Sequence, residues 1–177
     1  MRKIPAVSLG VLFSVVTSST LAAQTSIYMT VDGIPGDQTA APHGGEFILS
    51  SASTGMQNTA TLSGAASGYA VGKATHAPVK VQMHFNALAS PKFSLDLVTG
   101  TRVPSVEIRL YKSTGLFYKT VFENVYVTSV STDASDDPVQ SVEFVYSRVR
   151  WFASPDAAGL TAPVQVACWD VATNAKC

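Results

Sequence analysis

Histidines near carboxylates or serines are the residues of this sequence best suited to act as acids, bases or nucleophiles. The candidates are the histidines His43, His76 and His84 and the aspartates Asp32, Asp96 and Asp170, any of which could orient an imidazole. Serines are plentiful, but the sequence lacks the Gly-x-Ser-x-Gly pattern that presents a nucleophilic serine between a strand and a helix. A lone histidine on a strand, such as His84, is more often a surface or hydrogen-bonded residue than a base. The sequence therefore predicts no catalytic site.

The possible metal and phosphate sites of this sequence are incomplete. Asp32 and Asp37 flank a Gly-Pro turn, and their carboxylates are the hard oxygen ligands that Ca²⁺ prefers. Two carboxylates without further acidic residues nearby fall short of a complete calcium shell. The two cysteines and the scattered histidines lack the usual ligand spacing of a zinc site. A phosphate-binding loop would need Ser or Thr after its lysine, and Gly72-Lys73-Ala74 fails that test. We therefore predict no metal and no cofactor.

The first 23 residues have the pattern of a secretory signal peptide. A basic start, Met1-Arg2-Lys3, precedes an apolar core from Ile4 to Val16 and the small residues Leu21-Ala22-Ala23 at the expected cleavage point. An uncleaved membrane anchor is the alternative, but the apolar stretch is shorter than the about 20 residues that a spanning helix needs. We expect residues 1–23 to be removed, and residues 24–177 to form one secreted or periplasmic domain without a membrane segment.

Cys168 and Cys177 are the only cysteines of the chain. In an exported protein, an even number of cysteines suggests a disulfide. Closing a loop of about ten residues would stabilise the fold by roughly 2–3 kcal/mol in the chain-entropy model. The alternative is one buried thiol and one thiol at a frayed terminus. We predict a disulfide between Cys168 and Cys177.

Length and charge limit the possible functions further. A chain of 177 residues, of which 46% are hydrophobic, can form one domain with a sizeable core. Twelve basic residues balance twelve acidic ones, and removal of the leader would leave ten basic residues and a net charge of −2. This balance gives no field that would recruit nucleic acid or an anionic membrane.

Three strands and two turns between Thr101 and Trp151 form the centre of the predicted fold. Ser105 to Leu110 alternates polar and apolar residues, Leu116 to Ser131 is rich in Val, Phe and Tyr, and Val139 to Trp151 follows a polar turn. The last strand is predicted to place Val142, Phe144 and Tyr146 on one face and Val145, Val149 and Trp151 on the other. Apolar residues on both faces indicate a barrel wall that is also covered from outside.

The first half of the mature chain predicts shorter elements. Strands are expected at Ser26–Val31, Phe47–Leu49 and Val79–Phe85, and a long projecting Gly-rich loop at Ser50–Ala77. One helix is expected to begin with Ser90 as its cap and Pro91 in the first turn, and to end at Gly100. Its buried stripe is predicted to contain Phe93, Leu97 and Leu95.

The ordered set of these segments resembles the haemolysin-coregulated protein (Hcp) family, the tube subunit of bacterial type VI secretion. The resemblance covers nearly the whole mature chain, on the following segments: Ile27 to Asp37, Gly72-Lys73 after the Gly-rich loop, Ser90-Pro91, Val125 to Ser131, and Trp169 to Asn174. Two features depart from the family's pattern, namely the secretory leader and Cys168 in front of Trp169-Asp170.

The resemblance implies a mainly β fold, an Hcp-like β-barrel of two packed antiparallel sheets with one short flanking α-helix and a long Gly-rich loop. It also implies self-assembly into six-membered rings that can stack into a tube, without a catalytic centre. The expected function is an exported structural protein, acting as tube component or secreted effector, with secretion-system components or effectors as further partners. The alternative is an exported, non-catalytic binding module that uses the Gly-rich loop on a partner outside any secretion machine.

Overall fold

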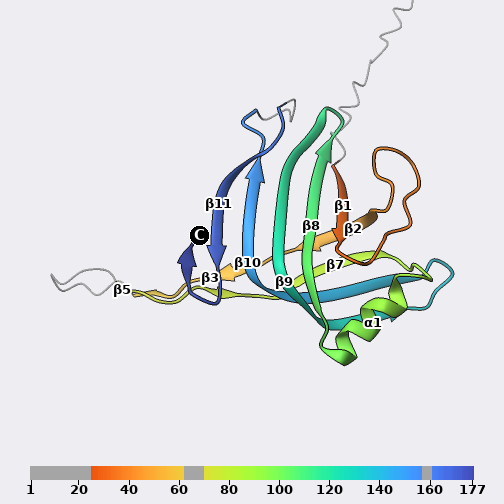
Figure 1. The fold of residues 1–177 in the computed structure, drawn as a ribbon, viewed down its shortest axis with the longest axis horizontal. Coiled ribbons are helices and arrows are strands. Elements are labelled where there is room, and N and C mark those ends of the chain that lie inside the picture. The colour runs from red at the N-terminus through yellow and green to blue at the C-terminus, as the bar shows by residue number, and fades with distance from the viewer. Residues whose placement is uncertain (1–24, 62–69, 157–160) are drawn as a thin grey trace, which may run out of the picture.

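The computed structural model describes residues 25–61, 70–156 and 161–177, so the predicted signal peptide lies outside the described residues. The described chain is mainly β (Figure 1). Its elements are the strands β1 (Ser26–Val31), β2 (Phe47–Ser53), β3 (Met56–Gln57), β4 (Ala60–Thr61), β5 (Ala70–Val71), β6 (Thr75–His76) and β7 (Val79–His84), then the helix α1 (Ser90–Thr99), and the strands β8 (Arg102–Lys112), β9 (Gly115–Asp133), β10 (Val139–Ala153), β11 (Val164–Asp170) and β12 (Ala175–Lys176).

The main sheet closes on itself and forms a barrel. Its strand order is β12-β11-β10-β7-β2-β1-β8-β9, and the additional pairing of β9 with β10 joins the two ends of the barrel. Every pairing within it is antiparallel. The fold class expected from the sequence is confirmed, with the two packed antiparallel sheets present as two halves of one continuous sheet. β11 and β12 extend the sheet beyond the barrel.

A common bend divides the long strands β8, β9 and β10 (Figure 1). Buried residues normally alternate along a strand, but at this level each strand has two core residues separated by two that are not buried. The pairs are Val103 and Val106 on β8, Phe122 and Val125 on β9, and Tyr146 and Val149 on β10. These residues also pair with one another across neighbouring strands. The three strands therefore switch the face that points into the core at the same level. The bend lets three strands line both halves of one core.

The core contains Val, Ile, Met and Phe from both halves of the sheet. Its most deeply buried side chains are Met29, Ile34, Phe47, Val79, Val81, Met83, Phe122, Val125, Val142 and Val149. Phe122 contacts the rings of Phe144 and Tyr146, with centroids 5.5 and 4.8 Å away. Such aromatic contacts, together with burial of β-branched side chains, stabilise a barrel of this size.

The bend corrects the predicted faces of β10. Val142, Phe144 and Tyr146 do share the inner face, but Val149 lies in the same core with an exposed fraction of only 1%. The prediction that Val149 points outward was wrong because the alternation is interrupted at Ser147. Val145 is 38% exposed, and Trp151 is partly buried against the core. The outer face of β10 is therefore less apolar than the sequence pattern indicated.

The helix α1 has the predicted length but a different N-terminal cap. Ser90 is buried and its Oγ accepts a hydrogen bond from the backbone N–H of Asn86 at 3.1 Å, so it does not cap the helix. The side chain of Asn86 accepts hydrogen bonds from Leu88 and Ala89 N–H instead. Gly100 ends the helix with φ of 63°, the left-handed conformation that favours glycine there. Of the predicted buried stripe, Phe93 and Leu97 face the core, whereas Leu95 is exposed.

The predicted Gly-rich loop is a projecting arm of paired strands. β3 pairs with β6 and β4 pairs with β5, which continues the β2–β7 ladder away from the barrel (Figure 1). We call residues 56–76, of which 62–69 lie outside the described residues, the arm. Projection was predicted correctly, but the predicted loop began too early, because Ser50 to Ser53 belong to β2 and pair with β7. Strand pairing in the arm was not predicted either, because the backbone hydrogen bonds that hold the arm do not require apolar side chains.

Candidate functional site

The three histidines lie apart from one another, and each has a partner other than the aspartates considered from the sequence. His43 Nδ1 lies 3.1 Å from Glu46 Oε2, His76 Nδ1 lies 2.9 Å from the hydroxyl of Tyr146, and His84 Nδ1 lies 3.1 Å from Asp137 Oδ1. His43 also stacks on Tyr28, with ring centroids 3.8 Å apart. Burial lowers the pKa of His76 and raises the pKa of Tyr146 to about 12, so this pair is held in its neutral form.

The candidate calcium ligands Asp32 and Asp37 are both exposed at the turn after β1. In the part of the chain that the structure describes, no group of three or more His, Cys, Asp or Glu side chains could hold a metal ion. No helix among these described residues is long and apolar enough to cross a membrane.

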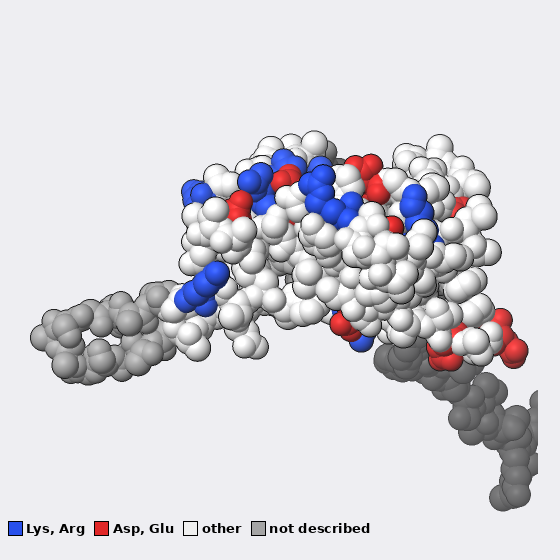
Figure 2. All heavy atoms as spheres, turned by 60° about the horizontal axis from the view of Figure 1, so that its bottom comes forward, with Lys and Arg blue, Asp and Glu red and all other residues white. Residues whose placement is uncertain are grey.

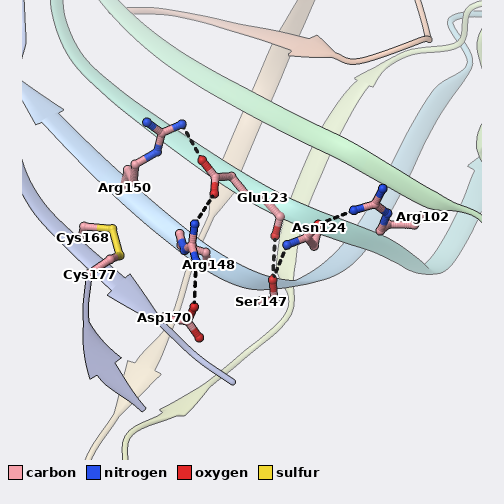
Figure 3. Close-up of polar contacts among 9 residues, drawn as sticks. All are labelled: Arg102, Glu123, Asn124, Ser147, Arg148, Arg150, Cys168, Asp170 and Cys177. Carbon is pink, nitrogen blue, oxygen red and sulfur yellow. Dashed lines mark hydrogen bonds and ion pairs between the residues drawn. A yellow bond between two sulfur atoms is a disulfide. The ribbon is translucent and has the colours of Figure 1, made fainter. Parts of the chain in front are cut away.

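Cys168 on β11 and Cys177, next to β12, are joined by a disulfide with 5.4 Å between the Cα atoms (Figure 3). The bond ties the end of the chain to the outermost strands of the sheet. Within the same hairpin, Asp170 Oδ1 accepts the backbone N–H of Thr173 at 3.0 Å. Disulfide and turn together fix the position of the short strand β12 against β11.

A row of ion pairs crosses the outer face of β8, β9 and β10. Arg109 contacts both Glu107 and the buried Glu46, and Lys119 lies 3.5 Å from Glu107. Burial acts to lower the pKa of Arg109, but the hydrogen bond and charge of Glu107 and the charge of Glu46 outweigh it and raise the pKa. Because Glu46 is buried, its pairing with Arg109 avoids the cost of an isolated buried charge.

A second cluster continues this row toward β11 (Figure 3). The carboxylate of Glu123 forms ion pairs with Arg150 and with Arg148, the latter at 3.3 Å. Arg148 forms a further ion pair with Asp170 at 3.1 Å. The hydrogen bond to Asp170 and the charge of Glu123 raise the pKa of Arg148. The backbone N–H of Thr173, followed by the hydrogen bond from Arg148, lowers the pKa of Asp170. The cluster joins β9, β10 and β11 outside the core.

Figure 2 shows charged side chains of both signs gathered along one margin of the body, while most of the remaining surface in that view is uncharged. Mixed signs cancel at a distance, so this margin creates no single-sign field. It is unlike the basic patch by which proteins bind nucleic acid.

An apolar groove of about 390 Å³ lies where the base of the arm meets the edge of the sheet. We call it the arm-base groove, and its walls come from β3, β6, β10, β11 and β12. It is lined by Met56, Ala74, His76, Trp151, Val166, Ala167, Cys168, Trp169 and Lys176. The volume lies within the range of ligand pockets, and Lys176 is the one charged residue among the described residues that line it.

Sequence reasoning missed both the ion-pair row and the arm-base groove. The polar positions Glu107, Arg109 and Glu123 were visible as the outward half of an alternating pattern. Their partners could not be found, because pairing depends on which strands lie side by side. The groove had no local signal at all, since its two walls come from segments about 75 to 120 residues apart.

Several solved structures share the fold of this barrel. A solved structure described as that of a type six secretion system protein matches with a TM-score of 0.77 and 23% identity, and the match covers 87% of this chain and 100% of that chain. Hcp1 from Salmonella typhimurium matches with a TM-score of 0.72 and 20% identity, covering 88% and 100%. A type VI secretion system effector from Yersinia pestis matches with a TM-score of 0.63 and 18% identity, covering 82% and 99%. At these identities the likeness shows the fold alone.

Curated proteins provide no sequence match to this chain. A family model does match, over residues 28–152, and these residues run from β1 to β10 and so contain all the strands that close the barrel. The chain therefore belongs to the family described as the type VI secretion system effector Hcp.

Proposed function

We propose that this protein is an exported structural subunit that assembles with copies of itself into rings, of six members by resemblance to the family's tube subunit, and that the rings can stack. It acts as a tube component or a secreted effector of type VI secretion. The observation that carries this proposal is the family match over the complete set of barrel strands. The proposed role is structural rather than enzymatic, with no metal or cofactor.

The distribution of polar groups supports a structural role. The histidines are bound to neighbouring side chains at three separate places, and the charged residues of the ion-pair row on β8 to β11 pair with one another. Such an arrangement stabilises a rigid wall, and among the described residues it leaves no pair of these groups converging on a substrate. A barrel wall whose outer charges are paired in this way is suited to repeated packing against copies of itself.

The proposal includes removal of residues 1–23 as a signal peptide, and a secreted or periplasmic location for residues 24–177. N-terminal sequencing of protein recovered from the periplasm of a Gram-negative host would test this. A chain starting at residue 23 or 24 is expected. Recovery of intact Met1 in the membrane fraction would contradict the export proposal and leave the ring proposal standing.

Light scattering and negative-stain imaging of the non-reduced protein test assembly directly. We expect a mass near six copies and ring-shaped particles, with stacks at higher concentration. A monomer at high micromolar concentration would exclude the tube role. In that case the second candidate, an exported binding module that uses the arm on another partner, would gain support, since the arm projects from the barrel (Figure 1).

A further inference from the structure

The solvent-facing side of α1 carries an apolar stripe that nothing in the described chain covers. Leu88 just before the helix is 88% exposed, and Leu95 and Val98 on the helix are 57% and 78% exposed. With the exposed Pro91 these residues are spaced i, i+3, i+7 and i+10, which places them on one side of the helix. We call them the α1 stripe.

A surface helix normally has a polar outer face. The inner side of α1 is held by Phe93, which packs on Phe47 with ring centroids 5.8 Å apart, and by Leu97, which packs against the core. The outer side departs from the usual pattern, because the α1 stripe lies there beside the exposed Lys92, Ser94 and Thr99. The α1 stripe therefore has the character of a contact surface rather than of a solvated face.

The arm-base groove is a second uncovered apolar surface, and it lies at the other end of the molecule. Figure 1 shows α1 below the right-hand end of the barrel, whereas β3, β11 and the C-terminus lie at the left. Met56 and Val166 line the groove and are 48% and 59% exposed. A protrusion at one end and a hollow at the other cannot meet within one chain, but they can meet between two copies.

We propose that the α1 stripe of one copy docks into the arm-base groove of the next copy. This inference rests on the proposed self-assembly and assigns the two surfaces that carry it. An amphipathic helix that lays i, i+3 and i+7 side chains into an apolar groove is a common mode of protein recognition. Because the two surfaces differ, the contact is head-to-tail, and it extends from copy to copy until a ring closes or a stack ends.

Charge at the two surfaces supports the same occupant. The C-terminal end of a helix carries a partial negative charge, and α1 has no basic residue in its last turn to offset it. Val98 lies in that turn. Lys176 is the charged residue of the groove, so docking of Val98 would bring this lysine near the helix C-terminus.

The disulfide has a place in this contact. Cys168 lines the groove and Lys176 directly precedes Cys177, so the bond between the two cysteines holds one wall of the groove in position. An exported, oxidised chain would therefore present a preformed groove, which reduces the ordering cost of association.

Two double variants of the full chain, produced by export in a Gram-negative host, test the contact. The stripe variant is Leu95→Lys with Val98→Lys, and the groove variant is Met56→Lys with Val166→Lys. Val145→Lys, an exposed apolar residue outside both surfaces, is the matched control. Circular dichroism and thermal unfolding check that each variant is folded. Light scattering should give a single-copy mass for both double variants and the parent mass for the control.

Mixing the two double variants gives the sharpest result. Each retains one intact surface, so an equimolar mixture is expected to form two-copy particles and nothing larger, while neither variant alone exceeds one copy. Folded variants that assemble as the parent does would overturn the assigned contact and leave the ring proposal intact. Two single-copy variants that fail to pair would also overturn it, since these surfaces would then not be complementary. A single-copy parent would overturn both proposals.

Discussion

The side-chain amide of Asn124 on β9 donates a hydrogen bond to Oγ of Ser147 on β10 at 2.8 Å, in the row where both strands bend (Figure 3). Arg102 of β8 donates to Oδ1 of the same asparagine at 2.6 Å, and Val171 N–H donates to the carbonyl of Ser147 at 2.7 Å. Asn124 has φ of 51°, the left-handed region that most residues avoid. One asparagine thus joins three strands and also adopts the conformation that turns them.

Replacing Asn124 should destabilise the barrel. We expect Asn124→Ala to lower the free energy of unfolding by about 1–3 kcal/mol, because alanine loses the hydrogen bonds and is strained at positive φ. Asn124→Gly loses the same bonds but accepts the backbone conformation. Its free energy of unfolding should therefore be about 1 kcal/mol higher than that of Asn124→Ala. Urea unfolding of the two variants measures the difference. Equal losses would show that the left-handed conformation does not matter.

The disulfide should hold the C-terminal hairpin. Intact-mass measurement should show a gain of two hydrogen atoms when the native protein is treated with a thiol reductant, and Cys177→Ser should lower the free energy of unfolding by roughly 2–3 kcal/mol. The amides of Ala175 and Lys176 in β12 should then exchange faster with deuterium, while amides of β1 serve as the internal control. Two thiols that react freely with an alkylating agent in the native, unreduced protein would contradict the predicted bond.

The His76–Tyr146 contact predicts a pH dependence of stability. Burial lowers the pKa of His76 in the folded state from the ordinary value of 6.5, so the unfolded chain binds this proton more readily. The free energy of unfolding should therefore fall as the pH drops below 6.5, and this contribution should become constant below the lowered pKa. His76→Gln should flatten the fall in thermal midpoint over that window.

His84→Gln is the matched control for that series, since His84 is exposed and pairs with the exposed Asp137. It should leave the slope attributed to His76 in place. If the two variants give identical midpoints at every pH, burial of His76 plays no part in the acid response.

Removal of the arm should leave the barrel folded. Among the described residues, β3 to β6 pair only with one another and form sheets separate from the barrel. We expect that replacing residues 58–73 by a short turn keeps the thermal midpoint within a few degrees and weakens the stacking of rings seen by negative stain. The retained residues Met56 and His76 keep the groove lined. Loss of folding would show that the arm supports the barrel after all.

Metal removal should have no effect on stability. Asp32 and Asp37 are the only candidates that the sequence offered for calcium, and both side chains are exposed. Treatment with a calcium chelator should leave the thermal midpoint unchanged, because metal that binds the folded state alone would raise it. A fall that is reversed by added Ca²⁺, but not by Mg²⁺, would reopen the calcium interpretation of this turn.

The sequence by itself determined the local elements and the type of fold. Ser26–Val31 forms a strand with the predicted bounds, and Gly100 ends the helix, because period-2 alternation and glycine at positive φ are properties of neighbouring residues. The ordered set of segments also indicated the family. A signal of the bend was present as well, since the polar pairs Glu123-Asn124 and Ser147-Arg148 interrupt the alternation of β9 and β10.

Only the tertiary structure decided which distant groups meet. The same bend brings Val149 into the core, and the ion pairs of Arg148 join residues on β9, β10 and β11 that no local pattern relates. Strand pairing in the arm and the arm-base groove depend on backbone hydrogen bonds and on surfaces from separate segments. Periodicity records which side chains share a face, whereas strand neighbours and bends are set by the energy of the whole packed barrel.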